Sequence, residues 1–205
     1  MFWSPLFALI ASLIAVAVES RYIYTIIMRH TIPNFTGWFI IALSMSFVFF
    51  SSVSAGAGSS IWLIGTLMIL HTIEAILSYF YGSFRITRFE KWLILFAFLS
   101  LVLWHLTDNS LYTIVINTLI DSCGMIAISY KLFRFPDTED RLAWWISVLI
   151  YGLDILAVTE WNIANSFFII VNFIECSIIF LLTFRHMHIL EKIRFRLALL
   201  FHIQL

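Results

Sequence analysis

Residues 61–91 read IWLIGTLMILHTIEAILSYFYGSFRITRFEK, an apolar stretch followed by three basic residues. The apolar part, Ile61–Tyr81, matches the roughly 20 residues that a helix needs to cross a hydrocarbon core of about 30 Å. A histidine and a glutamate, His71 and Glu74, lie in the middle of it. Because basic residues collect on the cytoplasmic side of membrane proteins, the pattern predicts a membrane span that ends inside the cell.

Six further apolar stretches occupy most of the remaining chain. The seven stretches are Phe2–Ser20, Trp38–Val53, Ile61–Tyr81, Trp92–Leu106, Leu111–Tyr130, Ala143–Val158 and Ala164–Phe184. All should be α-helices, because a backbone surrounded by lipid must satisfy its own hydrogen bonds. The fourth is the shortest, yet the charge pattern requires it. The sequence therefore predicts an all-α integral membrane protein with seven transmembrane helices.

The basic residues all fall on one side of this arrangement. The twelve are Arg21, Arg29, Arg85, Arg88, Lys91, Lys131, Arg134, Arg141, Arg185, Lys192, Arg194 and Arg196. The connections on the other side, at 54–60, 107–110 and 160–162, contain no Lys or Arg. The positive-inside rule then places the N-terminus outside and the C-terminus in the cytoplasm.

Composition agrees with a membrane protein and argues against other classes. The chain is 62% hydrophobic and 12% charged, with a mean hydropathy of +0.99, far from the balance of soluble domains. The first stretch lacks a charged n-region and a small-residue cleavage site, so we expect a retained span. Cys123 and Cys176 lie inside predicted spans and favour neither a disulfide nor a zinc site. No Gly-rich phosphate loop or nucleophile–base pair is present, so we expect no enzyme. The expected partner is the lipid bilayer rather than a nucleic acid.

An internal repeat relates the two halves of the chain. His71-Thr-Ile-Glu74 matches Asn172-Phe-Ile-Glu175, and a Phe-Arg pair follows each of them. Glu19 and Asp121 match as well, because each precedes a basic residue, a proline and then a tryptophan. The fourth helix restores the direction of the chain, so the two units should be parallel about an axis along the membrane normal. The expected divisions are a three-helix unit at 1–85, a linker helix at 86–109, a second three-helix unit at 110–185 and an amphipathic cytoplasmic tail at 186–205.

This 3+1+3 plan resembles the SWEET and PQ-loop superfamily, in particular its uncharacterised bacterial seven-span members. The residues that carry the resemblance are Tyr24, Arg29, Pro33, Asn34, Gly37, Trp38, Trp92, Trp104, Asp121, Lys131, Arg134, Pro136, Glu139 and Trp144. The plan is also similar to vitamin permeases of the nicotinamide riboside type and to lumenal retrieval-signal receptors. The proline–glutamine pair that names the superfamily is absent; Ser20-Arg21 and Gly124-Met125 stand about where a helix-kinking proline is expected.

Five carboxylates lie inside predicted spans, where an ionised acid costs roughly 2.5–3.5 kcal/mol at a helix centre. They are Glu19, Glu74, Asp121, Asp154 and Glu175. The repeat pairs Glu19 with Asp121 and Glu74 with Glu175, so we expect these four around a central cavity. Glu74 and Glu175 would bind the solute there, and Glu19 and Asp121, together with Arg21, would gate the cavity or couple it to protons. At least one should be protonated at neutral pH, because burial and nearby like charges disfavour ionisation. Alternatively, Glu19 pairs with a basic neighbour such as Arg21, and the others cap hydrogen-bond networks.

His71 and Asn172 share a helix face with Glu74 and Glu175 at the i, i+3 spacing. In sugar-conducting relatives a polar residue of each third helix contacts the solute, so the resemblance implies that His71 and Asn172 bind it.

Trp38 and Trp144 open the second helix of each unit and would frame the cytoplasmic mouth; the alternative is an interfacial belt of anchors. The charged segment 136–141 is interpreted as a solvated turn. Catalytic zinc requires three protein ligands, and only His71 and His105 are histidines within predicted spans, so we expect no metal and no cofactor.

We therefore expect a transporter that moves a small polar solute, sugar-like or vitamin-like, across a lipid bilayer by alternating access, with proton coupling as an option. The localisation that fits is a bacterial inner membrane. Seven helices can form a pathway as a monomer, and a homo-oligomer is the alternative assembly. The alternative function is a non-transporting seven-helix receptor or accessory protein.

Overall fold

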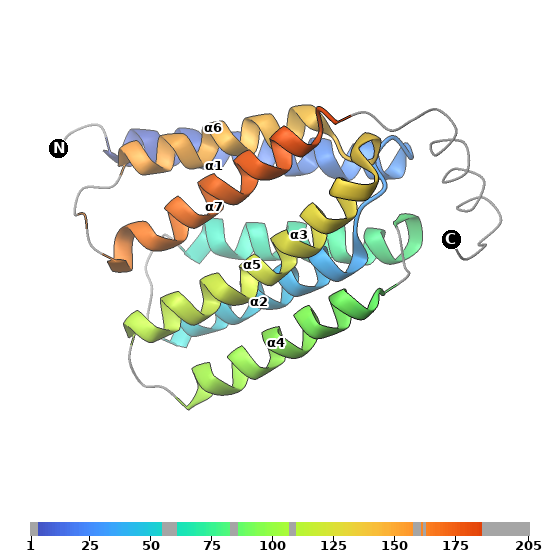
Figure 1. Cartoon of the computed structure of the whole chain (residues 1–205). Coiled ribbons are helices and arrows are strands. Elements are labelled where there is room, and N and C mark those ends of the chain that lie inside the picture. The colour runs from blue at the N-terminus through green and yellow to red at the C-terminus, as the bar shows by residue number, and fades with distance from the viewer. Residues whose placement is uncertain are drawn as a thin grey trace.

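The computed structural model describes residues 4–54, 61–82, 86–106, 110–157, 161 and 163–185. Within these ranges it is all-helical, as predicted (Figure 1). The helices are α1 (Ser4–Ile27), α2 (Phe35–Ser54), α3 (Ile61–Tyr81), α4 (Arg88–His105), α5 (Ser110–Arg134), the 3₁₀ helix η1 (Pro136–Thr138), α6 (Arg141–Ala157) and α7 (Ile163–Leu182). The seven α-helices correspond one to one with the seven apolar stretches of the sequence.

Six of the helices form a closed ring. α3 packs between α1 and α2, and α7 packs between α5 and α6. The two triplets meet through α1 against α6 and α2 against α5. Exchanging α1, α2 and α3 for α5, α6 and α7 leaves these packing relations unchanged. The seventh α-helix, α4, lies outside the ring against α5 and α2 (Figure 1).

The junction between α2 and α4 follows from two local sequence signals. Thr87 and Glu90 form a capping box at the start of α4, with the Glu90 amide donating to Thr87 Oγ1 at 3.2 Å and the Thr87 amide to Glu90 Oε2 at 2.7 Å. Asn34 caps α2 by accepting a hydrogen bond from the Gly37 amide at 2.6 Å. The Asn34 amide also donates to Glu90 Oε1 at 2.7 Å, so one carboxylate joins both helix starts.

Two glycines allow α2 and α5 to cross closely. A Cβ built on Gly37 would lie 2.9 Å from the Gly124 carbonyl oxygen, and one built on Gly124 would lie 2.8 Å from the Gly37 oxygen. Gly124 is one of the positions where the resemblance expected a kinking proline. The helices that contain these positions, α1 and α5, are assigned as single α-helices across Ser20-Arg21 and Gly124-Met125.

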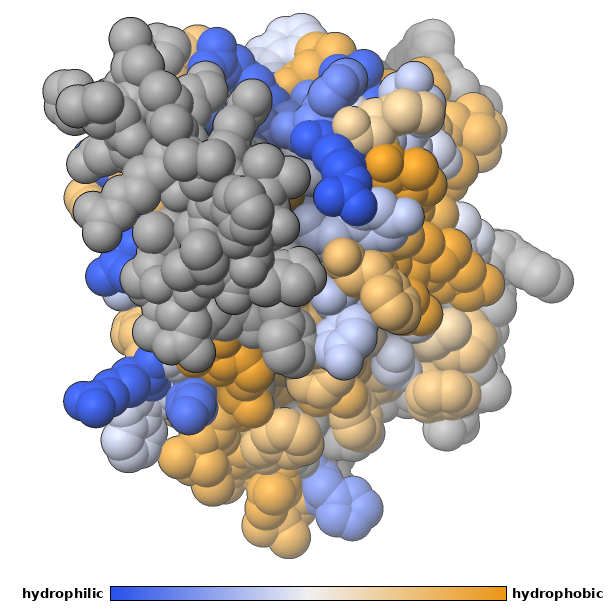
Figure 2. Space-filling view, turned by 90° about the vertical axis from the view of Figure 1, so that its right-hand side faces the viewer, coloured by the Kyte–Doolittle hydropathy of each residue, from blue (hydrophilic) through white to orange (hydrophobic). Residues whose placement is uncertain are grey.

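The described basic residues lie in or next to the helix ends that meet at one end of the bundle, called here the basic end. Arg21 of α1 forms an ion pair with Asp140 before α6 at 3.0 Å. Arg141 donates to the Thr183 carbonyl after α7 at 2.6 Å, and Arg185 donates to the Phe133 carbonyl at 3.0 Å. Figure 2 looks onto this end, where hydrophilic side chains lie among apolar side chains of the helix flanks.

Within the described ranges, none of the helices combines the length and the apolar character needed to cross a membrane. The predicted tail at 186–205 and the connections 55–60 and 107–109 lie outside the described residues, as does Arg85.

Candidate functional site

The first triplet brings together three of the predicted residues, called here the first cluster: Glu19 of α1 with His71 and Glu74 of α3. One ligand atom from each, a carboxylate oxygen or an imidazole nitrogen, lies within 4.8 Å of the other two. His71 Nδ1 is 2.9 Å from Glu74 Oε2. Glu74 is completely buried, and its second oxygen, Oε1, has no hydrogen-bond partner.

The second triplet assembles the equivalent residues, called here the second cluster: Asp121 of α5 with Asn172 and Glu175 of α7. Asp121 and Asn172 are buried and hydrogen-bonded to one another, and Glu175 lies within electrostatic range of Asp121. Glu175 also has one buried oxygen, Oε2, without a partner. Asp121 also interacts electrostatically with His71 of the first cluster.

Arg21 does not serve as the partner of Glu19. Its guanidinium forms the ion pair with Asp140 at the basic end, and its side chain is 44% exposed. Asp140 in turn caps α6 by accepting a hydrogen bond from the Leu142 amide at 2.9 Å. The alternative that assigned Arg21 to Glu19 is therefore wrong, and the role of Arg21 in this conformation is to join α1 to the start of α6.

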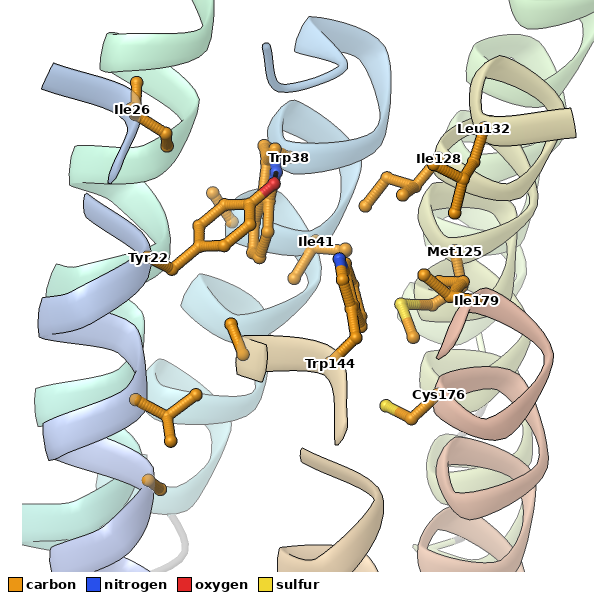
Figure 3. Close-up of a cluster of buried hydrophobic side chains, with 14 of the residues drawn as sticks. Tyr22, Ile26, Trp38, Ile41, Met125, Ile128, Leu132, Trp144, Cys176 and Ile179 are labelled. Carbon is orange, nitrogen blue, oxygen red and sulfur yellow. Dashed lines mark hydrogen bonds between the residues drawn. The ribbon is translucent and has the colours of Figure 1, made fainter. Parts of the chain in front are cut away.

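Trp38 and Trp144 are buried rather than interfacial, with 4% and 6% of their surface exposed. The belt-anchor alternative is therefore wrong for both indoles. Their rings lie 6.4 Å apart, and Tyr22 of α1 lies 5.1 Å from Trp38 and 6.2 Å from Trp144. Figure 3 shows the three side chains pointing toward one another from α1, α2 and α6. The Trp38 ring also contacts the His71 ring at 5.5 Å, which links the aromatic group to the first cluster.

Glu139 joins these aromatic residues, although the sequence placed it in a solvated turn. It is only 8% exposed, and Oε2 accepts hydrogen bonds from the Tyr22 hydroxyl at 2.5 Å and from Trp144 Nε1 at 3.1 Å. Trp38 Nε1 donates to the Tyr22 hydroxyl at 3.2 Å and completes the network. The solvated-turn interpretation is wrong because η1 folds this segment back onto α5, where Pro136 and Thr138 are buried.

Lys131 is the ionic partner of Glu139. Its ammonium group donates to Glu139 Oε1 and to the Ile32 carbonyl oxygen, and the pair is buried on both sides. Burial lowers the pKa of Lys131, and the Glu139 carboxylate opposes that shift. One sequence signal could have indicated the pair: a proline turn between Lys131 and Glu139 brings the chain back toward the end of α5.

A small cavity of about 30 Å³ lies between the first cluster and the aromatic group. Its walls come from α1, α2 and α6. The lining residues are Val18, Glu19, Tyr22, Trp38, Ala143, Trp144 and Ser147. This volume admits about one water molecule. Asp154, the remaining carboxylate within a predicted span, lies on α6 outside both clusters.

Searches of family models, curated proteins and solved structures returned no significant match to this chain.

Proposed function

We propose that the chain is a membrane protein that moves a small polar solute between its two helix triplets by alternating access. The observation that carries the proposal is the pair of acidic clusters, which come from equivalent helices of the ring and interact electrostatically through Asp121 and His71. Buried acids are costly to maintain, and ionisable residues inside a helix bundle mark solute and ion pathways.

The apolar surface of the bundle supports placement in a bilayer. α4 exposes large side chains around much of its circumference. They are Trp92, Leu95, Phe96, Phe98, Leu99, Val102 and Leu103. An apolar surface of this extent needs a membrane or a protein partner to cover it. The grouping of described Lys and Arg residues at the basic end then favours a cytoplasmic location for that end, as in a bacterial inner membrane.

The two contacts between the triplets suggest how access would alternate. α2 and α5 touch through backbone at Gly37 and Gly124, which suits a fixed pivot. α1 and α6 meet around the cavity, where Trp38 and Trp144 close the side toward the basic end. A sugar-sized or vitamin-sized solute exceeds a volume of about 30 Å³, so binding would require α1 and α6 to separate. If transport is coupled to protons, Asp121 and Glu175 would bind and release them.

The first experiment is a thermal-shift screen of the purified chain against sugars, vitamins, amino acids and nucleosides. A ligand at about a hundred times its dissociation constant stabilises the folded state by about 2.7 kcal/mol. A hit should then show flux in proteoliposomes, and Glu175→Gln should abolish that flux while leaving the melting temperature of the unliganded protein within a few degrees.

The matched control is Asp154→Asn, which removes a carboxylate of α6 outside both clusters and should leave flux intact. Binding without flux would contradict transport and favour the receptor function. Silence across the panel, with folded protein, would count against a solute site of this chemistry.

A further inference from the structure

The first cluster has the composition of a metal-binding site. It offers one imidazole nitrogen from His71 and one carboxylate oxygen each from Glu19 and Glu74, with the three atoms within 4.8 Å of one another. The ligands come from α1 and α3, which pack directly together. Sequence spacing revealed only the His71-x-x-Glu74 pair, because Glu19 lies on a different helix.

The charge of the cluster is not balanced by the described basic residues. The ion pairs of Arg21 and Lys131 go to Asp140 and Glu139 at the basic end. In the described part of the chain, Glu74 makes an ion pair with His71 alone, at 2.9 Å. The carboxyl groups of Glu19 and Glu74 approach one another, and Glu74 Oε1 is buried without a hydrogen-bond donor. A divalent cation would neutralise two carboxylates and occupy that unpartnered oxygen.

The adjoining cavity supplies the remaining coordination position. Glu19 belongs to both the cluster and the cavity wall, and the volume of about 30 Å³ accommodates one water molecule. Zinc sites with three protein ligands commonly complete a tetrahedron with water. The Trp38 ring, 5.5 Å from the His71 ring, shields the cluster on the side of the basic end.

We propose that Glu19, His71 and Glu74 bind one divalent transition-metal ion, with a water molecule in the cavity as fourth ligand. A mixed nitrogen and oxygen donor set suits Zn²⁺, Co²⁺ or Fe²⁺ better than Mg²⁺. Bonds of about 2.0–2.2 Å place tetrahedral ligand atoms roughly 3.4 Å apart, so the cluster needs only a small inward movement. Binding of the ion is a property separate from flux and does not depend on the transport proposal.

The second cluster provides a natural comparison within the same chain. It has carboxylates at the equivalent helices, Asp121 and Glu175, but Asn172 stands where the first cluster has His71. An amide oxygen is a poor ligand for zinc beside an imidazole. One ion per chain is therefore expected, and His71→Asn should make the first cluster resemble the second.

The test uses the purified full-length chain, stripped with a chelator and titrated with Zn²⁺ and, separately, with Co²⁺. We expect one Zn²⁺ per chain by elemental analysis, a visible Co²⁺ absorption band that Zn²⁺ displaces, and no effect of Mg²⁺. Glu19→Gln, His71→Asn and Glu74→Gln should each weaken Zn²⁺ binding by more than the roughly 10–100-fold that loss of a ligand's hydrogen-bond partner costs.

The controls separate a lost ligand from a lost fold. Asp154→Asn and His105→Asn remove the same kinds of group outside the cluster and should leave the Zn²⁺ affinity unchanged. Glu19→His replaces one zinc ligand with another and should retain binding that Glu19→Gln loses. Zn²⁺ binding that survives His71→Asn in folded protein would overturn the proposal, as would the absence of stoichiometric binding to the wild-type chain. If the wild-type chain binds no stoichiometric Zn²⁺, a proton shared by Glu19 and Glu74 would explain why their carboxyl groups lie close together.

Discussion

Lys131 and Glu139 form an ion pair that is buried on both sides, and the Glu139 carboxylate opposes the lowering that burial imposes on the pKa of Lys131. Removing one partner of such a pair typically costs about 3–5 kcal/mol, because an uncompensated charge stays buried. Glu139 also accepts hydrogen bonds from Tyr22 and Trp144, so its loss affects the closure of the cavity. The pair therefore couples the end of α5 to the aromatic residues of α1 and α6.

We predict that Glu139→Gln destabilises the protein by about 3 kcal/mol or more at pH 7 and by less near pH 10. Burial lowers the pKa of Lys131 from 10.5, and the substitution removes the carboxylate that opposes this shift. The unfolded chain then binds more protons than the folded chain, so stability rises with pH. The destabilisation caused by the buried charge is complete below the pKa that Lys131 has in the folded variant. It disappears above the pKa that Lys131 has in the unfolded chain. Denaturant unfolding at several pH values measures it.

The double variant Lys131→Met with Glu139→Gln should recover part of the lost stability, because no buried charge remains. A Glu139→Gln protein as stable as the wild type at pH 7 would refute the coupling of these two residues. The prediction concerns residues whose partners sequence reasoning could not assign. In the sequence, Lys131 and Glu139 are charged and close to a proline, a pattern that fits a solvated turn equally well. The two residues meet only because η1 folds back onto α5.

At the level of the helices, the sequence predicted what local physics determines. Long apolar stretches bounded by charged or turn-forming residues marked all seven α-helices, and Ile61–Tyr81 agrees with α3 at both ends. The ends of α1 and α5 were less predictable: α1 continues beyond Ser20 to Ile27, and the added part contains Tyr22, which is buried against Trp38 and Trp144. Tertiary packing, rather than hydropathy, extends that helix.

We predict opposite effects for alanine at two glycines within helices. Gly124→Ala places a Cβ 2.6 Å from Ile41 Cγ1 and 2.8 Å from the Gly37 oxygen, so α2 and α5 must separate. Overpacking of this kind costs about 1–3 kcal/mol. Gly152→Ala meets nothing closer than Phe173 Cε2 at 3.7 Å and should gain about 0.5–1 kcal/mol of helix propensity. Thermal unfolding of the two variants should therefore shift in opposite directions; equal shifts would argue against a close crossing.

At the scale of the whole molecule, the ring follows from pairwise packing that no single stretch of sequence encodes. The repeat in the sequence related Glu19 to Asp121 and Glu74 to Glu175, and these residues occur on equivalent helices of the two triplets. Which helices touch was not accessible from hydropathy, because apolar faces are interchangeable until side chains interdigitate. The exchange symmetry of the ring relates the two clusters about one axis, which runs through the ring from one end of the bundle to the other.

The transport proposal requires those two ends to face different compartments, and cysteine labelling measures this directly. Both native cysteines, Cys123 and Cys176, are buried, so their background reaction with a membrane-impermeant maleimide should be low. Trp161 lies between α6 and α7, at the end opposite the basic end, and is 63% exposed. In intact bacterial cells made permeable only at the outer membrane, Trp161→Cys should react at once. Arg88→Cys, at the start of α4, should react only after the cells are lysed, because the inner membrane shields the basic end. Equal labelling of both positions before lysis, or of neither, would exclude the proposed orientation and with it a pathway through the ring.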